Sequence, residues 1–145
     1  MAKAYCSAVI PASATAVWAV VRDFNALPQW TPFVAESRIE QKKESDQVGC
    51  IRNFRLKDGG KIREQLLSLS DYEMSFEYSI LESPMRVENY VATFRLIPVT
   101  DSDHTFAEWT AEFDAAPDRE DGLVDSIGRN VFAAGLAALK ARFNR

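Results

Sequence analysis

The most regular hydrophobic pattern of the chain lies near its C-terminal end, over residues 123–143. Lys140 and Arg142 occupy its last turn, where positive charge interacts favourably with a helix dipole. Apolar or small residues recur three and four positions apart, at Val124, Ile127, Gly128, Val131, Phe132, Gly135, Leu136, Leu139 and Phe143. This spacing is typical of one face of an α-helix, so we predict a long helix over residues 123–143.

The apolar face of this helix is uneven in size. Leu136 and Leu139 are bulky, whereas Gly128 and Gly135 have no side chain. A glycine inside a helix costs about 1 kcal/mol relative to alanine, so it usually has a structural reason. Two reasons are open at this point: close packing of the helix against another element, or room for a bound molecule.

The N-terminal part of the chain predicts one strand and two short helices. Residues 4–10 alternate weakly and are expected to form the strand. Ser13 is a suitable N-cap for a helix that runs to about residue 22. Residues 25–32 are expected to form a second short helix or a turn, because Pro28 and Pro32 interrupt them.

From residue 33 onward the pattern changes to segments rich in β-branched and aromatic residues with much alternation. Six strands are predicted, over residues 34–41, 49–57, 61–70, 74–81, 87–99 and 105–115. Asp58-Gly59-Gly60 is a strong hairpin turn, and the other connections are also short. Short connections favour an antiparallel meander. The expected class is therefore α+β, with a seven-stranded antiparallel sheet and a long C-terminal helix that covers one face.

Alternation along each strand indicates which side chains face the helix. Arg52 and Glu64 fall on this inner face, together with the apolar or aromatic residues Phe54, Leu56, Ile62, Leu66, Tyr90, Ala92, Phe94, Leu96, Trp109, Ala111 and Phe113. Two buried charges without partners would be costly, so they should pair, or be bridged by water, if both are interior. The alternative is that one or both lie at a strand end and reach solvent.

Composition and charge exclude several classes of protein. The 145 residues are expected to form one domain, and the net charge of −4 argues against binding to nucleic acid. No segment is long and apolar enough for a membrane span, and the N-terminus has no secretory signal, so we expect a cytoplasmic protein. Cys6, Cys50 and His104 are too few for a common zinc site. We expect no metal and no cofactor, two reduced thiols, His104 in a polar turn, and a monomer or homodimer.

Four segments together resemble the SRPBCC superfamily, the START-like and birch-pollen-allergen-like group that includes bacterial polyketide cyclase/dehydrase-like proteins. They are Val17-Trp18-Ala19-Val20-Val21-Arg22-Asp23-Phe24, Val48-Gly49-Cys50-Ile51-Arg52, Arg63-Glu64-Gln65-Leu66-Leu67 and Asn89-Tyr90. The resemblance extends over nearly the whole chain. It implies a helix-grip fold, in which the curved sheet wraps around the long helix and leaves a cavity between them.

Within this superfamily the chain is similar to the plant abscisic-acid receptors and their bacterial relatives. That similarity implies a cavity surrounded by Arg52, Glu64, Tyr90, Trp109, Ile127, Val131 and Gly135. Ala35 occupies the position of the lysine that meets the hormone carboxylate in the receptors. The turn Asp58-Gly59-Gly60 replaces their gate loop, and residues 82–87 keep only the arginine of their latch, Arg86. These departures argue against hormone sensing.

Three functional hypotheses follow. The first is a carrier or sensor that binds a small hydrophobic molecule, such as a lipid, a polyketide or another aromatic or isoprenoid-like compound, with no catalysis. The second is a polyketide cyclase/aromatase-type enzyme or a related dehydratase, with Glu64 as the base and Arg52 and Tyr90 as donors. We rank the first hypothesis above the second. The expected ligand-binding residues are Arg52, Phe54, Glu64, Tyr90, Ala92, Trp109, Phe113, Ile127, Val131 and Gly135.

The third hypothesis is a protein-interaction module. Trp30 lies between two prolines and close to Leu27 and Phe33, so these side chains could form an exposed apolar rim. The alternative is that they cover the mouth of the sheet. On the long helix, we expect Leu136, Leu139 and Phe143 to anchor it, and Gly135 to leave space near Tyr90 and Trp109.

Overall fold

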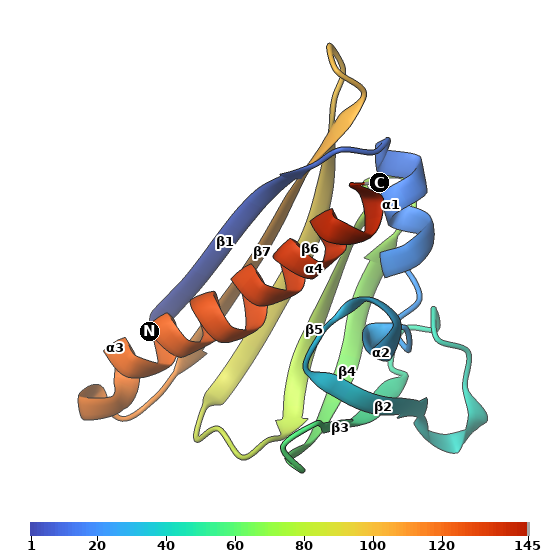
Figure 1. The fold of residues 1–145 in the computed structure, drawn as a ribbon. Coiled ribbons are helices and arrows are strands. Elements are labelled where there is room, and N and C mark those ends of the chain that lie inside the picture. Colours follow the sequence, from blue (N-terminus) through green and yellow to red (C-terminus); the bar gives the residue numbers. More distant parts are fainter. Residues whose placement is uncertain (145) are drawn as a thin grey trace.

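Seven antiparallel strands form one sheet in the computed structural model, which describes residues 1–144. The order across the sheet is β1-β7-β6-β5-β4-β3-β2. The strands are β1 (Ala2–Ile10), β2 (Val34–Ile39), β3 (Ile51–Leu56), β4 (Lys61–Ser70), β5 (Ser75–Glu82), β6 (Glu88–Val99) and β7 (His104–Asp114). The sheet curves around the long C-terminal helix, as Figure 1 shows. The predicted helix-grip fold is confirmed.

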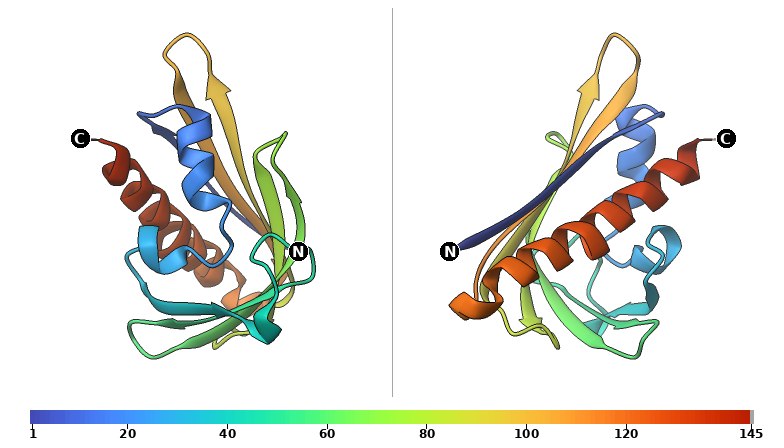
Figure 2. Two further views of the ribbon diagram at one scale, coloured as in Figure 1. Left: turned by 90° about the vertical axis from the view of Figure 1, so that its right-hand side faces the viewer. Right: turned by 60° about the vertical axis from the view of Figure 1, so that its left-hand side comes forward.

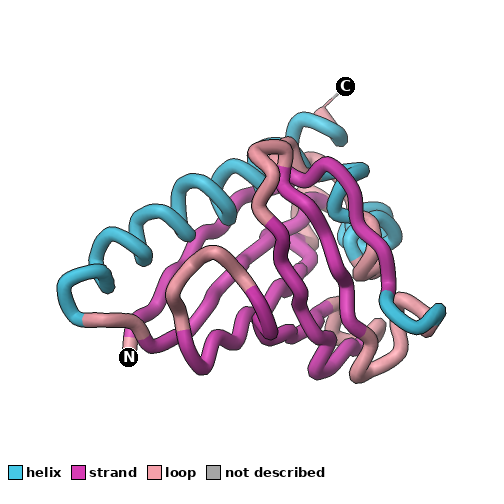
Figure 3. Tube along the Cα trace, turned by 90° about the horizontal axis from the view of Figure 1, so that it is seen from below, coloured by secondary structure: helices cyan, strands magenta, loops and turns pink. Residues whose placement is uncertain are grey.

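The C-terminal helix is continuous but has three parts. These are α3 (Pro117–Ser126), a π-helical segment η2 (Ile127–Ala133) and α4 (Ala134–Phe143). The helix begins at Pro117, before the predicted start at residue 123. The prediction missed these first turns because their residues are largely polar and have no apolar periodicity. Pro117 at the helix start and Asp118 in the first turn are the signals that mark this beginning. The two views of Figure 2 and the view of Figure 3 show the helix lying along the hollow side of the sheet.

The two predicted short helices are present after β1. They are α1 (Ala14–Val21) and α2 (Leu27–Trp30), and both lie beside the C-terminal half of the long helix in Figure 1. Ser13 caps α1 as expected, since its hydroxyl accepts a hydrogen bond from the Ala16 N–H at 3.2 Å. The second predicted strand ends earlier than residue 41. Gln41 and Lys42 have φ of 58° and 57°, so the chain leaves the extended conformation in the short 3-10 turn η1 (Glu40–Lys42).

An aromatic cluster fills the part of the interior next to α4. The Trp109 ring stacks on Phe132 with centroids 4.6 Å apart, and it meets Phe94 edge-on at 5.3 Å. Trp30 from α2 closes the cluster at 5.8 Å from Trp109. The strand residues Ala92, Phe94, Leu96, Ala111 and Phe113, which alternation assigns to the inner face, are all buried. These ring contacts pack the long helix and α2 against the sheet.

Within the described part of the chain, no helix is both long enough and apolar enough to cross a membrane.

Candidate functional site

A cavity of about 390 Å³ lies between η2 and the strands β3 to β6. Its walls are mainly apolar: Leu27, Phe33, Phe54, Leu56, Ile62, Ile80, Pro84, Met85, Ile127 and Val131. The polar or amphipathic lining residues are Arg52, Asp58, Glu64, Tyr78, Tyr90, Trp109, Ser126 and Asn130. A largely apolar cavity with a few polar groups is typical of a binding site for a small organic molecule.

Seven of the ten expected ligand-binding residues line this cavity: Arg52, Phe54, Glu64, Tyr90, Trp109, Ile127 and Val131. The other three lie elsewhere in the interior. Ala92 and Phe113 are buried within the sheet–helix core, where Phe113 stacks on Tyr90 with ring centroids 5.9 Å apart. Alternation assigned them correctly to the inner face, but only part of that face borders the cavity.

Gly135 was expected to leave space, and this expectation is wrong. A Cβ atom at this position would lie 2.9 Å from Cζ3 of Trp109 and 3.6 Å from Cζ3 of Trp30. Both rings are buried, and they fill the space that a side chain at residue 135 would occupy. Gly135 allows α4 to approach the sheet closely, which is the close-packing alternative for this glycine.

The hairpin of β3 and β4 brings Arg52 and Glu64 together. Gly59 adopts φ of 98° in the turn, and the resulting register places Arg52 directly opposite Glu64. Arg52 is 2% exposed and Glu64 is 6% exposed, so both charges are interior and neither lies at a solvent-exposed end of its strand. Nε and Nη2 of Arg52 lie 2.8 and 2.6 Å from the same oxygen, Oε1 of Glu64. The two residues therefore form a buried ion pair.

Further contacts hold the Arg52 guanidinium in place. Its Nη1 donates to the Phe24 carbonyl oxygen at 3.1 Å. The guanidinium carbon lies 3.9 Å from the centroid of the Phe24 ring and 4.7 Å from that of the Tyr78 ring. Cation–π contacts of this kind are favourable when the cation is shielded from water. Arg52 is thus held by Phe24 in the connection between α1 and α2, by Glu64 of β4 and by Tyr78 of β5.

The second carboxylate oxygen of Glu64, Oε2, has no hydrogen-bond partner among residues 1–144. In the same residues, no fully enclosed side-chain nitrogen or oxygen lacks a partner, so Oε2 borders open space. Because Glu64 lines the cavity, that space is the cavity itself. Burial raises the pKa of Glu64, and the adjacent Arg52 charge opposes this change.

Two tyrosines complete the polar part of the cavity. Trp109 Nε1 donates to the Tyr78 hydroxyl oxygen at 2.9 Å, so the Tyr78 oxygen accepts there, while its O–H group can still act as a donor. Burial raises the pKa of Tyr78 and of Tyr90, and the nearby charge of Glu64 raises both further. Both hydroxyl groups therefore stay protonated at neutral pH. Sequence reasoning missed Tyr78, although alternation with Phe76 and Ile80 in its strand could have placed it on the inner face.

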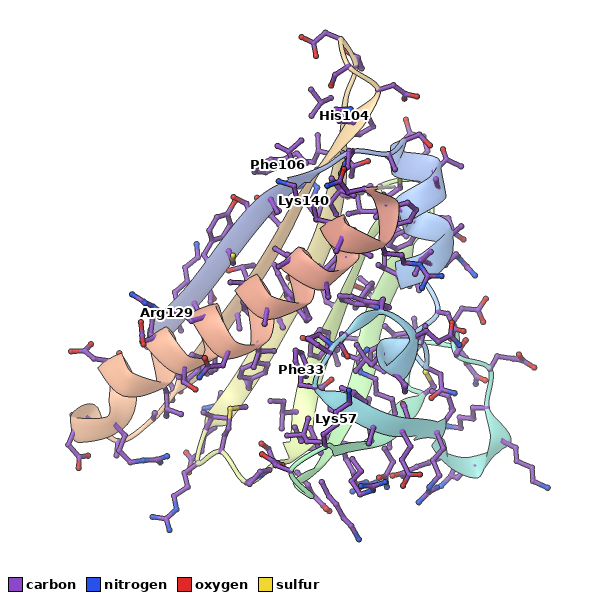
Figure 4. All side chains as sticks on the ribbon, viewed as in Figure 1. Phe33, Lys57, His104, Phe106, Arg129 and Lys140 are labelled. Atoms are coloured by element: carbon purple, nitrogen blue, oxygen red, sulfur yellow. The ribbon has the colours of Figure 1, made fainter. Side chains whose placement is uncertain are left out.

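The mouth of the cavity is formed by two loops and by the segment before β2. Asp58 belongs to the β3–β4 turn, where its Oδ1 accepts the Gly60 N–H at 2.9 Å. Pro84 and Met85 come from the β5–β6 connection, and Phe33 is labelled beside β2 in Figure 4. The two segments that align with the receptor gate and latch thus border the cavity. Ala35, aligned with the receptor lysine, is exposed and is not part of the lining.

Two other residues singled out from the sequence lie away from this cavity. Trp30 is buried against Trp109 and Phe94, so it is not part of an exposed apolar rim. His104 is the first residue of β7, paired with Val99 and half-buried, rather than part of a solvated turn. Figure 4 shows it near the far end of the β6–β7 hairpin. Cys6 and Cys50 are free thiols.

Comparison with known proteins supports the assignment of this fold. A protein from Thermobifida fusca is similar in structure, with a TM-score of 0.90 and 31% identity over 100% of this chain and 95% of its own. XoxI from Bacillus cereus has a TM-score of 0.88 and 29% identity, covering 99% of this chain and 96% of its own. A START superfamily protein from Mycobacterium smegmatis has a TM-score of 0.79 at 16% identity, over 97% and 96% of the two chains, and shows the fold alone.

No curated protein matches the chain. The family described as "Polyketide cyclase / dehydrase and lipid transport" matches residues 1–144. Because this match spans nearly the entire chain and the fold agrees with it, the protein belongs to the polyketide cyclase/dehydrase and lipid transport family of SRPBCC-type proteins.

Proposed function

We propose that this protein binds a small hydrophobic molecule in the cavity between η2 and the sheet, and acts as its carrier or sensor. The observation that carries this proposal is the cavity of about 390 Å³ with mainly apolar walls. This volume is within the usual range of small-molecule sites, roughly 300–1,000 Å³. The description of the family, which includes lipid transport, supports the same role.

The π-helical segment gives the proposal independent support. It contributes Ile127, Asn130 and Val131 to the cavity wall. Segments with π-helical hydrogen bonding are less favourable than α-helix and occur frequently at functional sites. The π-helical geometry is therefore found where the helix borders the cavity, and Phe132 of the same segment also packs on Trp109 in the aromatic cluster.

A cyclase/aromatase activity is the second candidate, and one observation favours it. Glu64 Oε2 borders the cavity and is therefore accessible to a substrate proton. The position of Arg52 is unfavourable to this role, since two of its nitrogen atoms contact Oε1 and stabilise the carboxylate form. An enzyme of this type would lose turnover in Glu64→Gln while still binding its substrate. We rank ligand binding without chemistry first.

Binding of N-phenyl-1-naphthylamine, an uncharged fluorescent probe, tests the proposal. We expect the wild-type protein to enhance its fluorescence in a saturable manner. Val131→Phe should raise the dissociation constant about tenfold or more, because the phenyl ring would occupy part of the cavity.

The matched control is Ala137→Phe, at an exposed position of the same helix. This variant should bind the probe as the wild-type protein does. The proposal is overturned if the wild-type protein does not bind the probe, or if both variants bind it equally well.

A further inference from the structure

We infer that the ligand is an uncharged molecule whose hydroxyl group donates a hydrogen bond to Oε2 of Glu64. This inference rests on the proposed function and specifies the chemical class of the ligand. It follows from three features of the cavity: the balance of its charges, the Oε2 atom of Glu64, which accepts no hydrogen bond from residues 1–144, and the hydroxyl hydrogen of Tyr78.

The balance of charges disfavours an anionic ligand. The charged residues that line the cavity are one cation, Arg52, and two carboxylates, Glu64 and Asp58. Arg52 is already neutralised, since Nε and Nη2 both contact Glu64 Oε1 and Nη1 is bonded to a backbone carbonyl. An anion entering the cavity would lose its hydration and find no uncompensated cation among the described residues that line it.

A cationic ligand is disfavoured for the opposite reason. Among the described lining residues, Glu64 is the one buried carboxylate, and Nη2 of Arg52 already lies 2.6 Å from its Oε1. A second cation on the same carboxylate would lie close to Arg52, where repulsion is poorly screened by solvent. Asp58 lies at the mouth, in the exposed β3–β4 turn, so an ammonium group there would remain in water.

The open hydrogen-bonding capacity favours a hydroxyl group. A carboxylate oxygen only accepts hydrogen bonds, so Glu64 Oε2 requires a donor. The Tyr78 hydroxyl accepts from Trp109 and still has its hydrogen to donate. A ligand hydroxyl can donate to Glu64 Oε2 and accept from a tyrosine in the same cavity, which satisfies both groups. A plain hydrocarbon leaves both unsatisfied, and this is costly for buried polar groups.

Four probes with the same ring system test this inference: 2-naphthol, naphthalene, 2-naphthoate and 2-naphthylmethylamine, each in competition with N-phenyl-1-naphthylamine at neutral pH. We expect 2-naphthol to bind about tenfold more tightly than naphthalene, since a hydrogen bond to a charged group contributes an effect of this size. The anionic 2-naphthoate and the cationic 2-naphthylmethylamine should bind at least about tenfold more weakly than 2-naphthol.

The variant Glu64→Gln provides the sharpest test, because it removes the charge that neutralises Arg52. In this variant the preference should reverse, with 2-naphthoate binding more tightly than 2-naphthol. The matched control is Glu40→Gln, which removes a carboxylate from the Arg63–Glu40 ion pair, whose atoms lie 2.6 Å apart away from the cavity. This control should keep the wild-type order of affinities.

The outcomes separate the two proposals. If N-phenyl-1-naphthylamine and all four naphthalene compounds fail to bind the wild-type protein, the proposed function is wrong. If they bind but 2-naphthoate competes as well as 2-naphthol, or if the order is unchanged in Glu64→Gln, ligand binding stands and the inference about its charge is overturned. Should Glu64→Gln not fold, the order of the four probes on the wild-type protein decides.

Discussion

Gly135 of α4 and Trp109 of β7 pack so closely that a Cβ atom on residue 135 would lie 2.9 Å from the indole ring. Trp109 cannot easily move away. One face of its ring stacks on Phe132, and its Nε1 is hydrogen-bonded to Tyr78. This contact joins the long helix to the sheet, and Trp109 also lines the cavity.

Replacement of Gly135 by alanine should therefore destabilise the protein. Alanine gains about 1 kcal/mol in helix propensity, but a methyl group at 2.9 Å from a fixed ring costs about 1–3 kcal/mol. We expect a net loss in the free energy of unfolding, measured by urea denaturation. Gly122→Ala in α3 is the control, because no atom lies within 4 Å of its new Cβ. That variant should gain about 0.5–1 kcal/mol. Equal gains at both positions would contradict the close packing.

Trp30 provides a second test of this packed cluster. It is 6% exposed and lies 5.9 Å from Phe94 and 5.8 Å from Trp109 between ring centroids. We expect Trp30→Ala to lower the free energy of unfolding by about 3–5 kcal/mol, as is usual for truncation of a buried aromatic residue. Tyr72→Ala, at a side chain that is 97% exposed, should change it by less than about 0.5 kcal/mol. A small effect at Trp30 would restore the hypothesis of an exposed interaction surface.

The Arg52–Glu64 pair predicts strong coupling between two substitutions. Arg52→Met leaves the Glu64 carboxylate buried without its partner, and this should cost about 3–5 kcal/mol. Replacing both residues, as in Arg52→Met with Glu64→Leu, removes the uncompensated charge and should recover most of that loss. Urea denaturation of the single and double variants measures the coupling. A double variant no more stable than Arg52→Met would show that the two charges are not paired in solution.

The ion pair on the outer side of the sheet predicts a dependence of stability on pH. The Arg63 guanidinium, with atoms 2.6 and 2.8 Å from the Glu40 carboxylate, lowers the pKa of Glu40 from 4.5 to about 2. Since the pKa is lower in the folded state, Glu40 contributes stability above pH 4.5, and this contribution is lost as the pH falls toward 2. Between about pH 5 and about pH 3, the wild-type protein should lose more stability than Glu40→Gln. The remaining carboxylates are common to both proteins, so parallel pH profiles would contradict the assignment.

Much of the fold could be predicted because it depends on local patterns of hydrophobic and polar residues. Alternation identified the strands, and the spacing of three and four residues identified the helix from residue 123 onward. Local signals also placed Arg52 and Glu64 on the inner face, and the hairpin turn at Gly59 accounts for their register. The start of the helix at Pro117 was missed, because α3 is largely polar and exposed and has little apolar periodicity.

The division of the interior between core and cavity could not be predicted in this way. Ile127, Val131 and Gly135 share one helix face in the sequence, but the first two line the cavity and the third contacts Trp109. A small residue either admits a neighbour or leaves space, and the choice depends on which side chain from a distant strand lies opposite it. The π-helical geometry of η2 has no signal in the periodicity either.

The sequence by itself determined the class of fold, the order of the elements and the inner-face residues of β3, β4, β6 and β7, since these follow from periodicities within short segments. Only the tertiary structure decided that Arg52 and Glu64 are buried and paired, and that Tyr78 lines the same cavity. It also decided that the ring of Trp109 occupies the space beside Gly135. These features depend on distances between side chains that are far apart in the chain, and such distances are set by how the helix and the curved sheet pack together.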